Sequence, residues 1–534
     1  MTRTNARIVI AGGGPVGLML ANLLARLGVE STVIERLERD EYIPPPRTNL
    51  VNARSMTLMR RLGIADDVRA ADPRSAEWID RLIFATRLNG FELWSFDGPF
   101  DTLNVDDDAP ELAEWTPEIA VTSPLRALAD RNGVDVRYGT EVVGLEQDED
   151  HVRVTVRDLG TGDESTIDGT YLAACDGPAS SVRRLLGVRL EGLSNMAQNG
   201  SWLIRAPQLR EMVAKSIGFG SFYWLINEDC PANIQPIDAE HWQFHLLTVP
   251  EGFNDDPETV KALVCATAGA TVDMEILSGG RWTLNSVLAP SLQIGRTFLV
   301  GDAGHLISPF GGFGMNIGLL DADNLAWKLA ATVQGWGGEE LLASYTTERH
   351  HADRYVMDIM ESNAKVLGRE LNRPGLEDPG PAGDKARAGI RDEILCEKEQ
   401  EFDSRYAVLG YRYDGSPVIL ADGTNPQPNT TPPYVPSARP GCLAPHVWLD
   451  GKSMYDRLGA GFTLLQLDPS AEVAGIVEAA EAAGVPLTTV AVQDERLSEL
   501  YEQPLVLIRP DQHVAWRGAA PANSRHIIDT VRGA

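Results

Sequence analysis

A glycine-rich turn close to the start of the chain limits the possible folds more than any other feature of the sequence. A β-type run, residues 6–11, precedes the turn Gly12-Gly13-Gly14-Pro15-Val16-Gly17, and a helical pattern then continues to Leu27. A second β-type run, Ser31 to Ile34, ends at Glu35, 18 positions after the last glycine of the turn. Strand, glycine turn, helix and strand with an acidic residue at this spacing predict a βαβ unit that binds a dinucleotide.

The positions of this turn have separate physical roles in such a unit. Gly12 permits the tight turn, Gly14 lets a pyrophosphate approach the backbone at the positive end of the helix, and Gly17 lets helix and strand pack closely. Glu35 is expected to accept hydrogen bonds from the adenosine ribose. The unit alone does not distinguish FAD from a nicotinamide dinucleotide. The candidate cofactor contacts in this segment are Gly12, Gly14, Pro15, Val16, Gly17, Glu35 and Arg36.

Two further motifs follow later in the chain. A strand-like run from Gly295 to Val300 leads into Gly301-Asp302-Ala303-Gly304-His305, and the segment from Ser308 to Asn316, with three glycines, opens a long helical pattern. The earlier segment from Ala174 to Arg183 contains the pair Asp176-Gly177. With the three motifs in this order, the chain resembles the class A flavoprotein monooxygenases, the single-component aromatic hydroxylases.

The resemblance implies a bound FAD and adds residues around it. Asp302 can hydrogen-bond the ribityl or pyrophosphate region. A helix that starts near Gly314 directs its positive end at the flavin N1/C2 carbonyl, where charge accumulates on reduction. Pro309 is implied to lie above the flavin beside the substrate, and for His305 a structural role is equally open. The contacts added on this basis are Arg47, Asp176, Asp302, Pro309, Gly312, Gly314, Met315 and Asn316.

The fold class implied by the resemblance is α/β. A Rossmann-like FAD-binding domain is interleaved with a β-sheet substrate domain, as in p-hydroxybenzoate hydroxylase, and a thioredoxin-like domain follows. The FAD-binding domain is expected to comprise residues 1–72, 118–187 and 290–395, and the substrate domain residues 73–117 and 188–289.

A proline-rich linker, residues 396–436, is expected to separate these domains from the C-terminal module, residues 437–534. The module has alternating strand and helix patterns and resembles the thioredoxin-like domain of phenol and polyketide hydroxylases. Because Cys442 is its only cysteine, the module cannot perform dithiol chemistry. We expect it to have a packing or oligomerisation role.

Aromatic residues concentrate in β-type runs between the Asp176 and Asp302 motifs. In one run Phe222 and Trp224 alternate with Tyr223, and in a later run Phe244 alternates with His245. This pattern predicts an apolar cavity for a flat substrate, with polar groups that polarise a phenol oxygen. An ordinary role in the sheet core is the competing interpretation for each residue. The candidates are Phe222, Trp224, Phe244 and Pro309 for substrate binding, and Tyr223, His245, Arg281 and Pro309 for catalysis.

One segment departs from the pattern of the family. In relatives, a helix before the strand that resembles Val134 to Tyr138 carries a glutamine that contacts the flavin. Residues 122–133 contain no glutamine, and the helix is expected to be about two turns shorter at its start. The sequence leaves open whether another group supplies that contact.

Charge and cysteine content limit the function classes. The chain has 47 Lys and Arg residues against 76 Asp and Glu residues, a formal net charge of −29, which argues against binding to nucleic acid or to acidic membranes. Its five cysteines form no CxxC pair, so we predict no metal site and a reducing, cytoplasmic location. No uninterrupted apolar run is long enough to span a bilayer.

The resemblance implies a monooxygenase that hydroxylates an aromatic or polyketide-like small molecule. In that family NAD(P)H reduces FAD, O₂ forms a flavin C4a-hydroperoxide, and one oxygen atom is transferred to the ring. Two alternatives stay open at this point. One is Baeyer–Villiger oxidation or epoxidation of a polyketide by a class A flavoprotein, and the other is a protein that binds FAD without catalysis.

Overall fold

The structure is a computed structural model that describes residues 7–39, 50–74, 78, 80–98, 108–249, 252–365, 370–424, 433–519 and 523–534. Arg47, one of the predicted cofactor contacts, lies outside the described residues.

A six-stranded sheet forms the centre of the first domain, in the order β17-β18-β11-β1-β2-β7. Its inner strands are parallel, and only the edge strand β17 is antiparallel to its neighbour. Parallel strands of this kind are buried on both faces and are rich in apolar residues, as in Ile8–Ala11. The strands are β1 (Ile8–Ala11), β2 (Ser31–Ile34), β7 (Asp135–Arg137), β11 (Tyr171–Ala174), β17 (Gln293–Ile294) and β18 (Thr297–Leu299).

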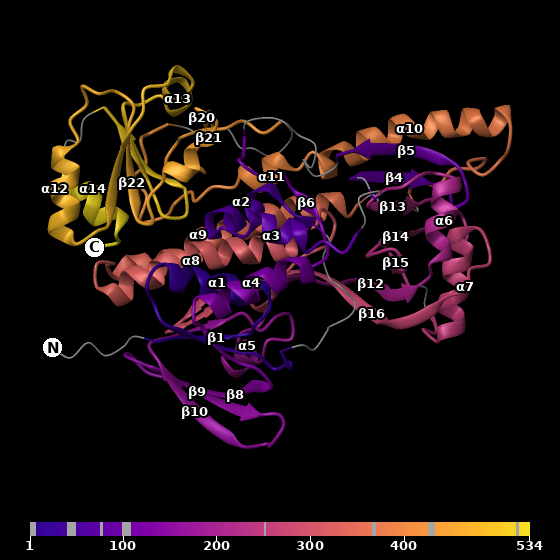
Figure 1. The fold of residues 1–534 in the computed structure, drawn as a ribbon, viewed down its shortest axis with the longest axis horizontal. Helices are drawn as coiled ribbons and strands as arrows, with labels where there is room; N and C mark the ends of the chain where they lie inside the picture. Colours follow the sequence, from indigo (N-terminus) through magenta and orange to yellow (C-terminus); the bar gives the residue numbers. More distant parts are fainter. Residues whose placement is uncertain are drawn as a thin grey trace.

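Helices cover one side of this sheet and a small antiparallel sheet packs on the other (Figure 1). Helix α1 packs against both α4 and α8. Helix α4 contains Pro124 and no glutamine, and its Leu125 carbonyl accepts a hydrogen bond of 2.9 Å from Asn22 on α1. The elements are α1 (Pro15–Arg26), α4 (Ile119–Arg131), α5 (Ser181–Leu185), α8 (Gly314–Gln334), α9 (Glu339–Asn363), β8 (Thr140–Gln147), β9 (Val152–Asp158) and β10 (Glu164–Gly169).

A second, eight-stranded sheet has the order β19-β16-β12-β15-β14-β13-β4-β5. Helices α6 (Gln208–Lys215) and α7 (Pro257–Ala268) cover one face, and α10 (Pro381–Phe402) packs over the β4–β5 end of the other. The strands are β4 (Arg81–Ala85), β5 (Glu92–Asp97), β12 (Glu191–Arg205), β13 (Phe222–Leu225), β14 (Ala232–Pro236), β15 (His241–Leu246), β16 (Glu275–Leu288) and β19 (His305–Leu306).

Shorter elements connect the two sheets. Helix α2 begins after Asn52, whose side chain accepts a hydrogen bond from the Ser55 backbone N–H, and it ends at Gly63 in the left-handed conformation. These elements are β3 (Leu50–Val51), α2 (Ala53–Leu62), α3 (Ala65–Ala70), β6 (Glu114–Trp115), α11 (Arg405–Leu409) and the short 3₁₀ turn η2 (Gly301–Ala303).

The C-terminal module has a four-stranded sheet in the order β23-β22-β24-β25, with β22 parallel to β23 and the other pairs antiparallel. The sequence pattern predicts the four strands β22 to β25 and the helices α12 and α14 in this order, and the structure adds β20, β21, η3 and α13. The elements are β20 (Trp448–Leu449), β21 (Lys452–Ser453), η3 (Met454–Arg457), β22 (Phe462–Gln466), α12 (Ala474–Ala483), β23 (Leu487–Ala491), α13 (Glu495–Tyr501), β24 (Leu505–Ile508), β25 (Val514–Gly518) and α14 (Ser524–Val531).

The module is fixed to the first domain at the end of α8 and α9 away from the eight-stranded sheet (Figure 1). The Glu348 carboxylate on α9 accepts hydrogen bonds of 2.5 and 2.8 Å from Arg509 and one of 2.7 Å from Lys328, and all three side chains are buried. Part of the expected linker is also packed, because α11 is helical and Tyr411 and Tyr413 are buried beside this contact.

Candidate flavin and substrate site

The glycine turn lies at the carboxyl end of β1, beside the carboxyl end of β11. Gly12 has a φ of +106°, and a side chain there would collide with the Cys175 carbonyl. A side chain at Gly17 would collide with the Gly12 carbonyl, so both positions require glycine. At Gly14, in contrast, a Cβ would meet no atom within 4 Å. Open space therefore lies directly over the N-terminus of α1, which can accept an anionic group.

Glu35 closes the other side of this turn. Its half-buried carboxylate accepts hydrogen bonds of 2.5 Å from the Gly13 N–H and 2.9 Å from the Leu37 N–H. The adjacent Arg36 is exposed. The carboxylate thus lies at the end of β2, beside the open space at the turn, where the sequence pattern predicts it.

The Asp176 and Asp302 motifs lie at the same sheet edge, because β11 pairs in parallel with both β1 and β18. Arg183 joins the two motifs, since it donates hydrogen bonds of 2.9 Å to the Ala303 carbonyl and 2.7 Å to the Pro178 carbonyl. One oxygen of Asp176 accepts a hydrogen bond of 3.1 Å from the Val182 N–H. Its other oxygen is buried and has no hydrogen-bond partner among the described residues.

The loop before α8 is held by a buried side chain. Asn316 donates hydrogen bonds of 2.7 Å to the Gly312 carbonyl and 3.1 Å to the Leu50 carbonyl, and its oxygen accepts one of 3.0 Å from the Asn52 N–H. Its amide is therefore used within the protein, and Asn316 positions the loop. A Cβ at Gly314, the first residue of α8, would have only one neighbour within 4 Å, at 3.9 Å. Beside it, Met315 is half-buried and Pro309 is exposed.

His305 belongs to a buried ionic cluster. Its Nε2 lies 2.8 Å from an Asp321 oxygen and 3.8 Å from an Asp353 oxygen, and Arg349 forms ion pairs with both aspartates. Burial alone would lower the pKa of His305, but the two carboxylates outweigh it and raise this pKa to about 9. The same Asp321 carboxylate accepts a hydrogen bond of 2.9 Å from the Gly301 N–H. The cluster therefore anchors the start of the Asp302 loop, which supports the structural role for His305.

These features fit FAD. A dinucleotide needs a backbone that it can approach closely, a helix N-terminus for its phosphates and polar groups at its ribose. The open space at Gly14 and Gly314, the start of α1 and the carboxylates of Glu35 and Asp176 supply them along one sheet edge.

The two faces of the eight-stranded sheet separate the predicted substrate residues. Phe222 and Trp224 lie on the face that meets the loop before α8, where the Trp224 and Phe310 ring centroids are 6.4 Å apart. Phe244 is buried in the opposite cluster, beneath α6 and α7. The structure corrects the expectation for this residue, because the pleat that directs Trp224 toward the loop directs Phe244 away from it.

Two predicted catalytic residues are also on the far face. The Tyr223 hydroxyl is buried and is satisfied by the Gly218 carbonyl at 3.0 Å and the Gly220 N–H at 2.9 Å. Arg281 is half-exposed and pairs with Asp255, next to the start of α7, at 3.4 Å. We therefore remove Tyr223 and Arg281 from the candidate catalytic set. His245 is the third polar candidate. It follows Phe244 in β15, so its side chain lies on the opposite, loop-facing side of the sheet.

Family comparisons agree with this geometry. Residues 5–359 match the family model of the FAD binding domain, and residues 437–533 match the model described as aromatic-ring hydroxylase, C-terminal. The chain belongs to the FAD-dependent aromatic-ring hydroxylases. It is a flavoprotein monooxygenase that uses FAD, NAD(P)H and O₂, so the predicted family, fold class, enzyme class and cofactors are confirmed.

Among its relatives, the hydroxylase is 30% identical to a putative polyketide hydroxylase of Streptomyces halstedii, over 98% of this chain and 96% of the relative. It is 31% identical to the aklavinone 12-hydroxylase DnrF of Streptomyces peucetius, over 84% and 88% of the two chains. The solved structure of the rebeccamycin biosynthetic enzyme RebC with reduced flavin is similar, with a TM-score of 0.89, 33% identity and 99% coverage of both chains. No described helix of the hydroxylase is both long and apolar enough to cross a bilayer.

His245 belongs to a polar row on the loop-facing side of the sheet, and the sequence interpretation missed the other members of this row. Its members come from four adjacent strands, and hydrogen bonds between side chains link all of them except Asn233. The signal that could have found them is the alternation of polar and apolar residues in β14, with Asn233 and Gln235 on either side of Ile234. The row comprises Ser201, Asn233, Gln235, Gln243, His245 and Trp282.

Proposed function

We propose that the hydroxylase inserts one oxygen atom into a phenolic ring of a fused, polyketide-like aromatic substrate that lies against the polar row. The observation that carries the proposal is that this row combines spare hydrogen-bonding groups with flanking aromatic rings. Trp224 on β13 lies to one side of it, and Trp282 on β16 belongs to its other end. Flat apolar walls with a few polar groups are typical of sites for fused aromatic ligands.

The hydrogen bonds of the row determine where its protons lie. His245 Nε2 faces the Gln235 amide nitrogen at 3.2 Å, so Nε2 accepts and the proton is on Nδ1. Nδ1 then donates to the Ser201 hydroxyl oxygen at 2.7 Å, and the Trp282 indole N–H donates to the same oxygen at 2.9 Å. An oxygen that accepts twice directs its own hydrogen elsewhere. Ser201 is therefore proposed to donate a hydrogen bond to a substrate carbonyl or phenolate oxygen.

The neutral form of His245 supports this arrangement. Burial lowers the pKa of His245 to about 4, so the imidazole carries one proton at neutral pH. We propose that His245 is a positioning residue that orients the Ser201 hydroxyl and does not remove the substrate proton itself.

Spare acceptors in the row indicate which groups the substrate carries. The Asn233 Oδ1 and Gln235 Oε1 atoms are buried and have no hydrogen-bond partner among the described residues. A buried acceptor left without a donor costs about 1–3 kcal/mol. Phenolic hydroxyl groups would supply the donors. A substrate with both hydroxyl and carbonyl groups on neighbouring rings therefore fits the row better than a plain hydrocarbon.

The cofactor contacts are proposed from the same geometry. The FAD pyrophosphate would lie over Gly14 at the N-terminus of α1, the ribose near Glu35, and the ring beside the Pro309 loop and the start of α8. When bound, FAD supplies the redox chemistry and activation of O₂. The loop-facing aromatic residues keep water from the reacting ring, and the α8 N-terminus stabilises negative charge near it.

A substrate panel tests the proposal. Hydroxylated naphthoquinones and anthraquinones are compared with the same ring systems without hydroxyl groups, and NAD(P)H oxidation, product mass and product NMR are measured. Hydroxylated compounds are expected to stimulate oxidation and to gain one oxygen as a new phenolic C–OH group. A lactone or epoxide product would establish the alternative oxygenation, and no stimulation by any hydroxylated compound would refute the proposed substrate class.

Ser201→Ala tests the role of the polar row. The variant is expected to lose most of the coupling between NAD(P)H oxidation and product formation while it keeps its FAD. Thr283→Ala is the matched control, because Thr283 is next to Trp282 on β16 and faces the other side of the sheet. Equal coupling in the two variants would contradict the role of Ser201.

A further inference from the structure

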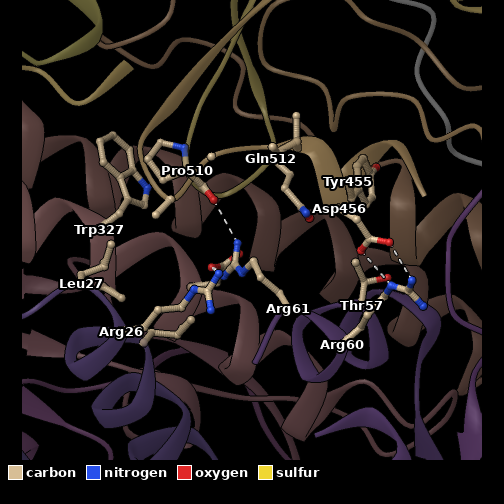
Figure 2. Close-up of a pocket in the computed structure, with 16 residues that line it drawn as sticks. Arg26, Leu27, Thr57, Arg60, Arg61, Trp327, Tyr455, Asp456, Pro510 and Gln512 are labelled. Carbon is tan, nitrogen blue, oxygen red and sulfur yellow. Dashed lines mark hydrogen bonds and ion pairs between the residues drawn. The ribbon is translucent and has the colours of Figure 1, made fainter. Parts of the chain in front are cut away.

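A cleft with a volume of about 210 Å³ lies between the first domain and the C-terminal module (Figure 2). Its walls come from α1, α2 and α8 on one side, and from η3, the loop after it and the turn between β24 and β25 on the other. Three arginines, Arg26, Arg60 and Arg61, line it against two aspartates, Asp323 and Asp456. This local excess of positive charge occurs in a chain whose formal net charge is −29.

The charges are balanced in one half of the cleft. Arg60 donates two hydrogen bonds to the Asp456 carboxylate, of 3.0 and 2.7 Å, and one of 2.8 Å to Glu111. Figure 2 shows Arg60 and Asp456 facing each other at this end of the cleft. No further anion is needed there.

The other half has fewer negative charges than positive ones. Asp323 is shared, because it forms ion pairs with both Arg61 and the buried Arg54. The remaining hydrogen bond of Arg61 goes to the neutral Pro510 carbonyl, at 2.9 Å. Arg26 is exposed and forms no hydrogen bond or ion pair with any residue that the structure describes. Figure 2 shows the guanidinium groups of Arg26 and Arg61 pointing toward one another.

We propose that this half of the cleft binds a small tetrahedral oxyanion, inorganic phosphate or a small phosphate monoester, between Arg26 and Arg61. Two like-charged guanidinium groups that converge repel each other, and an oxyanion between them accepts hydrogen bonds from both. Sites for drug-sized ligands are typically about 300–1,000 Å³. A cleft of about 210 Å³ is smaller, which favours a small anion over a dinucleotide or a fused-ring substrate.

The site is separate from the flavin site. Gly14 precedes the first residue of α1 and Arg26 is its last residue, so about 18 Å of helix separates them. Arg26 is in the last turn of α1, where a basic residue interacts favourably with the helix dipole. That interaction accounts for Arg26 alone and does not explain why Arg61 points toward Arg26. Binding at this cleft is therefore expected to be measurable with FAD in place.

Isothermal titration of the FAD-loaded, full-length protein with inorganic phosphate tests the proposal. The comparisons are sodium chloride at matched ionic strength, sulfate, a small phosphate monoester and malonate, a dicarboxylate. Saturable binding of phosphate with no change in the flavin absorbance is expected. Sulfate is expected to compete, and the relative affinity of the monoester decides between free phosphate and an esterified ligand. No saturable phosphate binding, or binding of malonate alone, would overturn the proposal.

Arg26→Gln is the decisive variant, because Arg26 is exposed and its replacement leaves every described ion pair of the cleft intact. Loss of one charged hydrogen-bond donor is expected to weaken phosphate binding about 10- to 100-fold. The matched control is Arg525→Gln, an arginine that is 88% exposed on α14 and outside the cleft. Unchanged phosphate affinity in Arg26→Gln, or equal loss in both variants, would refute the site.

Discussion

Substitution of Gly14 by valine separates binding of FAD from folding of its site. Gly14 has a φ of −72° and a ψ of −177°, a conformation open to any residue, and a Cβ there would meet no atom within 4 Å. We therefore expect Gly14→Val to fold, with a loss of about 1 kcal/mol in the free energy of unfolding, because valine replaces glycine at the N-cap of α1. The added carbons occupy the space over the α1 N-terminus that the FAD pyrophosphate would need.

The expected loss of affinity follows from the hydrogen bonds that the valine blocks. If it prevents two backbone N–H groups from reaching the phosphates, at about 1.5–3 kcal/mol for each charged hydrogen bond, FAD binding weakens by about 3–6 kcal/mol. That range corresponds to about 10²- to 10⁴-fold in Kd. The assay is titration of apoprotein with FAD, followed by quenching of flavin fluorescence, alongside unfolding in urea.

Two other glycines provide controls for this substitution. Gly389→Val, at an exposed position in α10 with open space around it, is expected to leave FAD affinity unchanged. Gly12→Val is expected to prevent folding, because of the positive φ and the collision with the Cys175 carbonyl. FAD affinity of Gly14→Val within a few-fold of the wild type would refute the assignment of the pyrophosphate site, and so would unfolding of this variant like that of Gly12→Val.

Three further substitutions test other parts of the structure. Asp302→Ala is expected to lower FAD occupancy, measured as the ratio of flavin to protein absorbance, and unchanged occupancy would contradict its role. Glu348→Gln removes the carboxylate shared by buried Lys328 and Arg509, of which Arg509 keeps Asp511, and is expected to lower the free energy of unfolding by about 3–5 kcal/mol, against less than about 1 kcal/mol for Asp168→Asn in an exposed ion pair. A similar cost for both, measured in urea, would refute the importance of the buried contact. For His305, a pKa raised to about 9 means that its charged form stabilises the fold by about 3 kcal/mol below pH 6.5, and that this contribution is lost as the pH rises through 9. The difference in unfolding free energy between the wild type and His305→Gln should shrink as the pH rises from 6.5 through 9. A difference independent of pH would contradict the stabilising role of charged His305.

The sequence was sufficient to predict the cofactor and the three motifs that meet at one sheet edge, because these signals are local. Each motif is a short segment in which backbone conformation limits the residue, as at Gly12, and parallel pairing of β1, β11 and β18 then brings the three motifs to one sheet edge. The C-terminal module was predictable for the same reason, since each of its strands and helices has its own periodic pattern.

The substrate half could not be predicted in the same way. Alternation in a strand establishes that Trp224 and Tyr223 face opposite sides, but it does not show which side meets the flavin loop. That depends on the contact between Trp224 and Phe310, which are 86 positions apart in the sequence. In β15, Phe244 was assigned to the cavity by its aromatic character alone, and the packing of α6 and α7 decides otherwise.

The two halves of the site also differ in how their polar groups are used. At the cofactor end, the side chains of Asn316 and Glu35 are occupied by backbone groups, so the protein's own hydrogen bonds hold the glycine loops in place before any ligand binds, although one Asp176 oxygen has no partner among the described residues. At the substrate end, Asn233 and Gln235 are buried with acceptors that no described residue satisfies. Loops that are held by hydrogen bonds within the protein suit a cofactor that is always the same, because these hydrogen bonds restrict the loop backbone to one conformation. Spare acceptors at the polar row carry an energetic cost that only a ligand with matching donors can remove, and the substrate preference of the hydroxylase is therefore expected to follow the positions of hydroxyl groups on the ring system more than its overall size.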